Sequence, residues 1–168
     1  MSPRPLLPAG RNLAPRLGRL VLALALALTA GVSDFAGFAW AQEISLGCLG
    51  GARLNESDLA RGTTIIVVWA SWSPRSRDIA TRVQPLASRW GDRARVLTVN
   101  FQEDGPAAER FLAGRNLGAP VCLDPDGAFS RKYNVATLPG LLIVKDGQVA
   151  YRGKLPDDAD RVIAGLLR

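Results

Sequence analysis

The sequence predicts an α/β domain with a mixed central β-sheet and helices on both of its faces. Three observations predict it. Residues 63–70 form a β-branched, apolar run, as expected of a central strand that is covered on both faces, and residues 96–101 form a second buried strand. Segments with helical periodicity alternate with such runs. Asp146 and Gly147 separate two extended runs as a two-residue hairpin turn, which makes the last strand pairing antiparallel.

Local patterns support the elements of the first half in order. A short strand is expected at 43–49 and a helical turn at 55–60, because Asn55 is a suitable N-cap. The buried strand at 63–70 leads to a helix of about 17 residues, in which Pro85 removes a backbone hydrogen bond and bends the helix. The apolar residues of that helix recur three or four positions apart: Ile79, Val83, Leu86 and Trp90.

The second half continues the alternation. Further elements are expected at 96–101 (strand), 107–115 (helix), 119–123 (strand), 126–133 (helix), 141–145 (strand) and 148–153 (strand). A last helix begins at Asp157 or Asp158 as its cap and places Val162, Ile163 and Leu166 on the side that covers the sheet. The chain of 168 residues, with 48% hydrophobic residues, is long enough for one domain with its own core.

The first 41 residues have the pattern of a secretory signal peptide. Four arginines precede an apolar run at 20–30, and the segment ends in the sequence A-W-A at Ala41. The apolar run has 11 residues, whereas about 20 are needed to cross a bilayer. We therefore expect cleavage between Ala41 and Gln42, a periplasmic or otherwise exported protein, and one domain at 42–168. An uncleaved leader that acts as a membrane anchor is the alternative.

Charge and composition exclude several functions. The leader holds four of the 21 basic and one of the 15 acidic residues, which leaves 17 basic and 14 acidic residues, too small an excess for nucleic-acid binding. The chain has no histidine, which removes Ser-His and Cys-His nucleophile pairs and the commonest metal ligand. Two cysteines cannot supply the four ligands of structural zinc. We expect no metal, no cofactor and no nucleic-acid partner.

The stretch WASWSPRS, from Trp69 to Ser76, resembles the active-site strand and helix of the thioredoxin superfamily. It is similar to the exported TlpA, ResA and CcmG type, which is related to the AhpC/TSA proteins and has the motif W-A-S-W-C-P-x-C. The segments at 54–62, 120–127 and 133–139 follow the order of that family as well, so the similarity covers about 44–168. The resemblance implies a thioredoxin-like fold. Members of that family serve periplasmic thiol reduction, cytochrome c maturation and oxidase assembly.

The redox motif itself is degenerate, W-S-x-x-S in place of W-C-x-x-C. Ser73 and Ser76 occupy both cysteine positions, and two hydroxyls neither form a disulfide nor ionise as thiols do. The family carries an acidic residue three positions after its second cysteine; this sequence has Ile79 there, and Asp78 would point about 100° away around the helix. We therefore expect no dithiol catalysis, and Ser73, followed by Pro74, is also a good helix cap. Deliberate replacement of both cysteines is an alternative, although it leaves Ile79 unexplained.

The resemblance implies that a polypeptide-binding surface remains. In the family, a cis proline faces the dithiol and the backbone beside it pairs with extended polypeptide; Leu138 and Pro139 match that position. The structural alternative is that Pro139 merely begins a strand. Trp72 is expected as an exposed aromatic anchor, with Ser73 beside it. Arg75 is either an anion-binding point at the helix start or a solvated charge.

The two family positions after Pro139 differ from the usual pair of threonines: this sequence has Gly140 and Leu141. The detailed contacts with a bound chain are therefore expected to differ as well. Trp69, in contrast to Trp72, is expected in the core.

Cys48 and Cys122 are the only cysteines, 74 positions apart. In an oxidising compartment a structural disulfide between them is credible, and by closing a long loop it would add roughly 4 kcal/mol to the stability. Two separate buried thiols and a displaced redox pair remain open alternatives, because a disulfide needs Cα atoms within about 7 Å.

The sequence leaves three functional hypotheses. The first is a redox-inactive protein that holds an extended polypeptide or an assembly partner in the cell envelope through Trp72, Ser73 and Pro139, with a membrane involved only if the leader is uncleaved. The alternative is a disulfide reductase of envelope redox homeostasis or cytochrome c maturation that acts through Cys48 and Cys122. A serine hydrolase at Ser73 or Ser76 is disfavoured, because the chain has no histidine and its arginines stay protonated.

Overall fold

The computed structural model describes residues 43–168, so the expected signal peptide and its cleavage site lie outside the described residues. The strands are β1 (Ser45–Gly47), β2 (Arg53–Asn55), β3 (Thr63–Trp69), β4 (Arg95–Phe101), β5 (Val121–Asp124), β6 (Gly140–Lys145) and β7 (Gln148–Lys154). The helices are α1 (Ile79–Trp90), α2 (Gly105–Leu112), α3 (Ala128–Lys132) and α4 (Ala159–Leu166), with short 3₁₀ turns η1 (Glu56–Leu59) and η2 (Pro74–Ser76).

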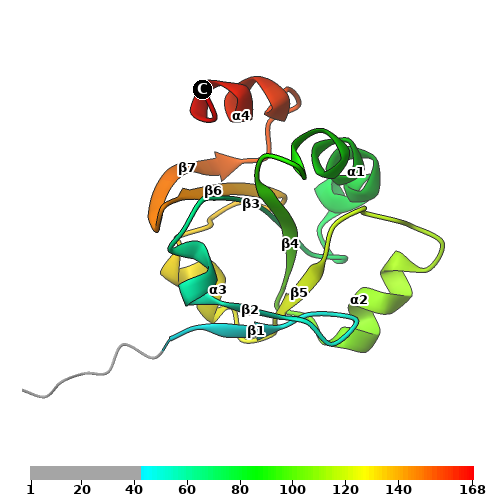
Figure 1. Ribbon diagram of the computed structural model, residues 1–168. Coiled ribbons are helices and arrows are strands. Elements are labelled where there is room, and N and C mark those ends of the chain that lie inside the picture. The colour runs from blue at the N-terminus through cyan, green and yellow to red at the C-terminus, as the bar shows by residue number, and fades with distance from the viewer. Residues whose placement is uncertain (1–42) are drawn as a thin grey trace, which may run out of the picture. The chain divides into compact units, whose positions relative to one another are not determined.

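A mixed five-stranded sheet forms the centre of the domain, in the order β5-β4-β3-β6-β7. Strand β4 pairs parallel with both β3 and β5, whereas β6 pairs antiparallel with both β3 and β7. Helices α1 and α4 cover one face of the sheet, and α3 covers the other together with the β1–β2 hairpin (Figure 1). This confirms the predicted α/β fold with a mixed sheet and helices on both faces.

The central strand β3 shows why its sequence lacks an alternating pattern. Ile65, Val67 and Trp69 pack in the core cluster under α1, and Ile66 and Val68 pack in the cluster on the opposite face. All five side chains are fully buried. A strand covered on both faces carries apolar residues at every position, and the run that predicted the strand has this cause.

The C-terminal hairpin and helix follow the predicted turn and cap. Asp146 and Gly147 both have positive φ angles, 49° and 79°, as a tight turn between β6 and β7 requires. The carboxylate of Asp158 accepts the N–H of Arg161 at 3.2 Å, which identifies Asp158 rather than Asp157 as the cap of α4.

The segment after β3 differs from the single helix of about 17 residues that the sequence predicts. The chain first forms the 3₁₀ turn η2, and α1 begins only at Ile79 because Asp78 has non-helical angles (φ −101°, ψ 18°). Ser73 lies at the N-cap of η2 with Pro74 after it, but its side chain makes no capping hydrogen bond. Ser73 is therefore a cap by position, as the sequence suggests, without a side-chain bond to the turn.

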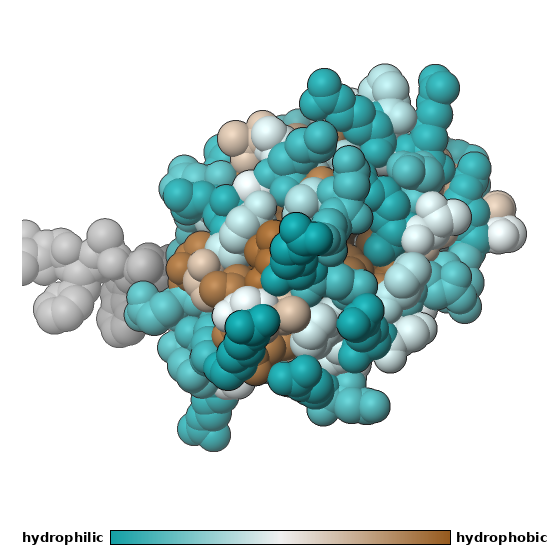
Figure 2. Space-filling model, turned by 90° about the horizontal axis from the view of Figure 1, so that it is seen from above, coloured by the Kyte–Doolittle hydropathy of each residue, from teal (hydrophilic) through white to brown (hydrophobic). Residues whose placement is uncertain are grey.

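The surface over α4 is mostly polar. Figure 2 shows this side of the molecule from above, with apolar residues visible between hydrophilic ones. Within residues 43–168, every helix is too short or too polar to span a membrane.

Candidate functional site

The segments that the sequence predicts as a site meet at the edge of the sheet where β3 ends. Val68, near the end of β3, pairs with Gly140, the first residue of β6. Pro139 precedes Gly140 and therefore lies beside the end of β3, from which the chain continues through Trp72 to Ser76. The Leu138–Pro139 peptide bond is cis, so this expectation is confirmed.

The two tryptophans of the motif have different roles. The side chain of Trp72 is 57% exposed, and its ring lies 6.3 Å from that of Phe101 at the end of β4. Trp69 is fully buried and packs against Phe111 of α2, with ring centroids 5.3 Å apart. Trp72 is therefore available to a partner, whereas Trp69 belongs to the core, as predicted.

The two serines are enclosed by the protein. Ser73 is 6% exposed and Ser76 is fully buried, and the N–H of Ser76 donates to the carbonyl of Ser73 at 2.9 Å. The hydroxyl of Ser76 has no hydrogen-bond partner among the described residues. Ile79 occupies the position of the family's acidic residue, and it is fully buried in the core. Nothing in this arrangement ionises either hydroxyl.

A carboxylate that the sequence analysis missed organises the loop before Trp72. Glu103 accepts the backbone N–H of Ser71 at 2.7 Å and also its hydroxyl, and the side-chain amide of Asn100 donates to the same carboxylate at 2.7 Å. Asn100 is the next-to-last residue of β4, and β4 runs parallel to β3. Polar residues just after β4 therefore meet the loop after β3, a signal that was available from the strand order.

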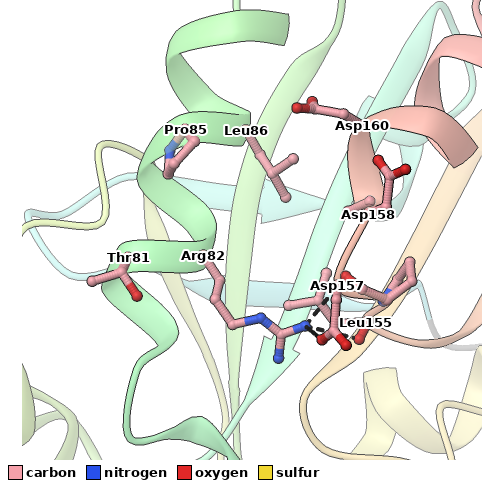
Figure 3. Close-up of a pocket in the computed structure, with 10 residues that line it drawn as sticks. Thr81, Arg82, Pro85, Leu86, Leu155, Asp157, Asp158 and Asp160 are labelled. Carbon is pink, nitrogen blue, oxygen red and sulfur yellow. Dashed lines mark hydrogen bonds and ion pairs between the residues drawn. The ribbon is translucent and has the colours of Figure 1, made fainter.

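A third segment adjoins Pro139. The N–H of Leu155 donates to the carbonyl of Pro139 at 2.9 Å, and Arg82 of α1 donates to the carbonyls of Leu155 at 3.0 Å and Pro156 at 3.2 Å. Arg82 also lies 3.4 Å from the carboxylate of Asp157. Figure 3 shows this side chain reaching from α1 across a hollow of about 200 Å³ toward the segment between β7 and α4.

The other sequence-predicted residues are distributed around this edge. Arg75 is exposed, and Leu138 is half-buried. Arg75 lies three positions after Trp72, and no ion pair within residues 43–168 includes it. Within the same residues, no group of three or more Cys, Asp or Glu side chains is arranged to hold a metal ion.

Cys48 and Cys122 form a disulfide, which excludes two separate buried thiols, one of the alternatives that the sequence left open. Cys122 lies in β5 and Cys48 follows β1, and the two residues form an isolated antiparallel bridge. Both pack in the core cluster under α3, on the face of the sheet opposite α1. The disulfide therefore lies on the face of the sheet opposite α1, the helix that follows Ser73 and Ser76.

An ion-pair cluster supports the segment that leads to Pro139. Glu56 accepts from Lys132 at 2.6 Å, from the hydroxyl of Tyr133 at 3.4 Å and from the N–H of Ile44 at 3.3 Å. Burial alone would raise the pKa of Glu56, but Lys132 and the hydrogen bonds hold it below its usual value. Burial, and then the charge of Glu56, raise the pKa of Tyr133 to about 12.

The sequence matches the model of one known protein family. The family model described as Redoxin matches residues 35–167. No curated protein matches the sequence significantly.

Several solved structures share the fold. A putative thiol:disulfide interchange protein DsbE from Chlorobium tepidum is 22% identical, with a TM-score of 0.63 over 74% of this chain and 89% of that one. The exposed lipoprotein thioredoxin Etrx1 from Streptococcus pneumoniae is 21% identical, with a TM-score of 0.65 over 74% and 97%. A secreted disulfide oxidoreductase from Mycobacterium tuberculosis, homologous to E. coli DsbE, is 19% identical, with a TM-score of 0.60 over 74% and 93%. These likenesses show a thioredoxin-like fold.

Proposed function

Because the chain belongs to the Redoxin family yet has serine at both dithiol positions, we propose that it is an exported protein that binds polypeptide without dithiol catalysis. Within the family we assign it to the TlpA, ResA and CcmG type, with W-S-x-x-S in place of W-C-x-x-C. One observation carries the proposal: Ser73 and Ser76 are buried in the segment after β3 that exposes Trp72, and the cis Pro139 precedes Gly140, which pairs with Val68 near the end of that strand. The reactive atoms are replaced while the surface around them is kept.

The partner is an extended polypeptide segment or an assembly partner in the cell envelope. Trp72 supplies a large apolar contact, because more than half of its surface is free. The backbone of Leu138 can pair with an extended chain, whereas Pro139 has no N–H and its carbonyl already accepts the N–H of Leu155. The hydroxyl of Ser73 cannot form a mixed disulfide with the partner, so binding is non-covalent and its release needs no reductant.

Two observations support export. The first 41 residues have the pattern of a signal peptide. Structural neighbours include an exposed lipoprotein and a secreted protein. Mass determination of the protein isolated after export tests this point: a chain that begins at Gln42 is expected, and a chain that keeps the leader would show that it remains as an anchor.

Capture of partners by the exported protein tests the binding function. Wild-type protein, Trp72→Ala and the control Val149→Ala are each used as bait; Val149 is the other exposed large apolar side chain among the described residues. We expect one dominant partner that binds wild type and Val149→Ala and is lost with Trp72→Ala. Equal capture by all three baits would refute the assignment of the binding surface.

The disulfide favours a second candidate, a thiol-disulfide oxidoreductase that acts through Cys48 and Cys122. Cys48 is half-buried, whereas Cys122 is 1% exposed, so a reductant's thiolate would attack the sulfur of Cys48 and release Cys122 as the thiolate. A Cys48→Ala/Cys122→Ala variant decides this candidate. Exchange activity that disappears with both sulfurs supports it, and activity that is absent from wild type excludes it.

A further inference from the structure

A hollow of about 440 Å³ lies next to Phe101, the residue on which Trp72 packs. It is lined by Phe101, Ser130, Arg131, Asn134, Val135 and Ala136. Phe101 ends β4, and the other five residues belong to α3 and to the segment that leads to Pro139. A polypeptide that crosses Trp72 and Pro139 therefore passes the mouth of this hollow, which we call the Phe101 hollow.

One wall of the Phe101 hollow carries a buried hydroxyl without a partner. Ser130 is 3% exposed, and its Oγ forms no hydrogen bond with any described residue. The hydroxyl is not needed to hold α3, because the backbone N–H of Ser130 already donates to Asp124 at 2.9 Å. A buried hydroxyl without a partner costs free energy, which a hydrogen bond from a ligand would recover.

The same wall carries a cation. Arg131 is exposed and donates to the carbonyl of Asp126 at 2.6 Å, but no ion pair within residues 43–168 includes it. The carboxylates of Asp124 and Asp126, which precede α3, accept backbone N–H groups of that helix. The guanidinium thus keeps donors free for an outside acceptor.

The remaining walls are apolar except at Asn134, which is exposed. Phe101 and Val135 are half-buried and pack at the edge of the core, and Ala136 lies beside them. The hollow therefore combines an apolar surface with the hydroxyl of Ser130, the guanidinium of Arg131 and the carboxamide of Asn134. A side chain with an aliphatic stem and a terminal carboxylate fits this hollow. Its stem can pack on the apolar surface, and the guanidinium of Arg131 and the hydroxyl of Ser130 can both donate to its oxygens.

We propose that the Phe101 hollow takes an aspartate or glutamate side chain of the polypeptide that binds at Trp72 and Pro139. The inference rests on the proposed function, since it assigns the sequence preference of that same surface. A lysine is rejected by the charge of Arg131, and a leucine leaves the Ser130 hydroxyl unpaired. The surface therefore selects extended segments that carry an acidic residue next to the residue on Trp72.

Selection from a library of random peptides displayed on phage tests the preference with the exported, full protein as bait. Four baits are compared: wild type, Trp72→Ala, Arg131→Glu and the control Arg61→Glu. Arg61 is also exposed, and it precedes β3, whereas Trp72 follows that strand. Arg61→Glu therefore makes the same change of charge as Arg131→Glu at the opposite end of β3. The affinity of one selected acidic peptide is then measured by fluorescence anisotropy for wild type, Ser130→Ala and Arg131→Ala.

Wild type and Arg61→Glu are expected to enrich peptides with one acidic position, and Arg131→Glu to lose or invert that preference. Ser130→Ala and Arg131→Ala should each lower the affinity for the acidic peptide on the order of tenfold. Ser130→Ala should keep the wild-type unfolding midpoint. Peptides that need Trp72 but show no acidic preference would overturn this inference and leave the proposed function standing. Selection that is absent, or unaffected by Trp72→Ala, would overturn both.

Discussion

The carboxylate of Glu103 accepts the backbone N–H of Ser71 at 2.7 Å, although 32 positions separate the two residues in the sequence. The Ser71 hydroxyl and the Asn100 amide donate to the same carboxylate. Because Trp72 follows Ser71 directly, this one side chain fixes the direction in which the exposed ring leaves the sheet.

Replacement of Glu103 by alanine is expected to loosen the loop that displays Trp72. The variant loses three accepted hydrogen bonds from a half-buried site, which should lower the free energy of unfolding by about 1–3 kcal/mol. Amide exchange of Ser71, followed by NMR, should become faster while exchange in β6 is kept. The control is Glu109→Ala on the exposed side of α2, and equal exchange of Ser71 in both variants would contradict the role of Glu103.

Arg82 ties α1 to the segment between β7 and α4 by two bonds to backbone carbonyls. Its side chain is only 19% exposed, so Arg82→Ala leaves both carbonyls short of a donor and should lower the free energy of unfolding by about 1–2 kcal/mol. Arg89→Ala is the matched control. The side chain of Arg89 is more exposed than that of Arg82, and its ion pair with Asp160 should contribute less than about 1 kcal/mol. Urea unfolding measures both, and equal losses would show that the carbonyl contacts of Arg82 contribute nothing special.

The Cys48–Cys122 disulfide joins the β1–β2 hairpin to β5 across 74 positions. Cys48→Ala/Cys122→Ala should lower the free energy of unfolding by roughly 4 kcal/mol, because the unfolded chain regains the freedom of a long loop. Urea unfolding of wild type in the presence of dithiothreitol should approach the variant. A variant with an unchanged midpoint would mean that the bond does not constrain the unfolded chain.

The cluster around Glu56 predicts how stability changes with pH. The pKa of Glu56 is lowered in the folded protein, so its contribution is present above the pKa of the unfolded chain and is lost as the pH falls through the folded value. The pKa of Tyr133 is raised to about 12, so its contribution is present below about pH 10 and is lost as the pH rises toward the folded value. Urea midpoints should therefore fall at both ends.

Glu56→Gln should remove the acid arm of this profile and reduce the alkaline arm only in part, because the burial that contributes most to the raised pKa of Tyr133 remains. The exposed Glu109→Gln serves as the control and should keep the wild-type profile. If Glu56→Gln retains both arms, other groups cause the dependence.

The fold could be predicted because local patterns and the sheet agree. The run from Ile65 to Trp69 is apolar at every position because both faces of β3 are covered, and the Asp146–Gly147 turn makes β6 and β7 antiparallel. The short β2 strand was not predicted, since three residues hold too little pattern, and the late start of α1 depends on the backbone angles of Asp78.

The candidate site could be predicted only where it is continuous in sequence. Trp72 and the serines lie in one motif, and the cis Pro139 followed from the resemblance. Glu103 binds Ser71, which is 32 positions away, and Arg82 binds the carbonyl of Leu155, which is 73 positions away, so no local pattern marks these contacts. The pairing of Cys48 with Cys122 was likewise open, because it depends on the distance between two strands.

The central claim is that hydroxyls at positions 73 and 76 leave the protein without dithiol chemistry. Insulin reduction by dithiothreitol tests it most directly, with the exported protein, its Ser73→Cys/Ser76→Cys variant and no protein compared in parallel. We expect wild type to match the reaction without protein, and the double variant to accelerate it because the thiols return to the start of η2 beside Pro139. Acceleration by wild type as large as that by the double variant would contradict the account.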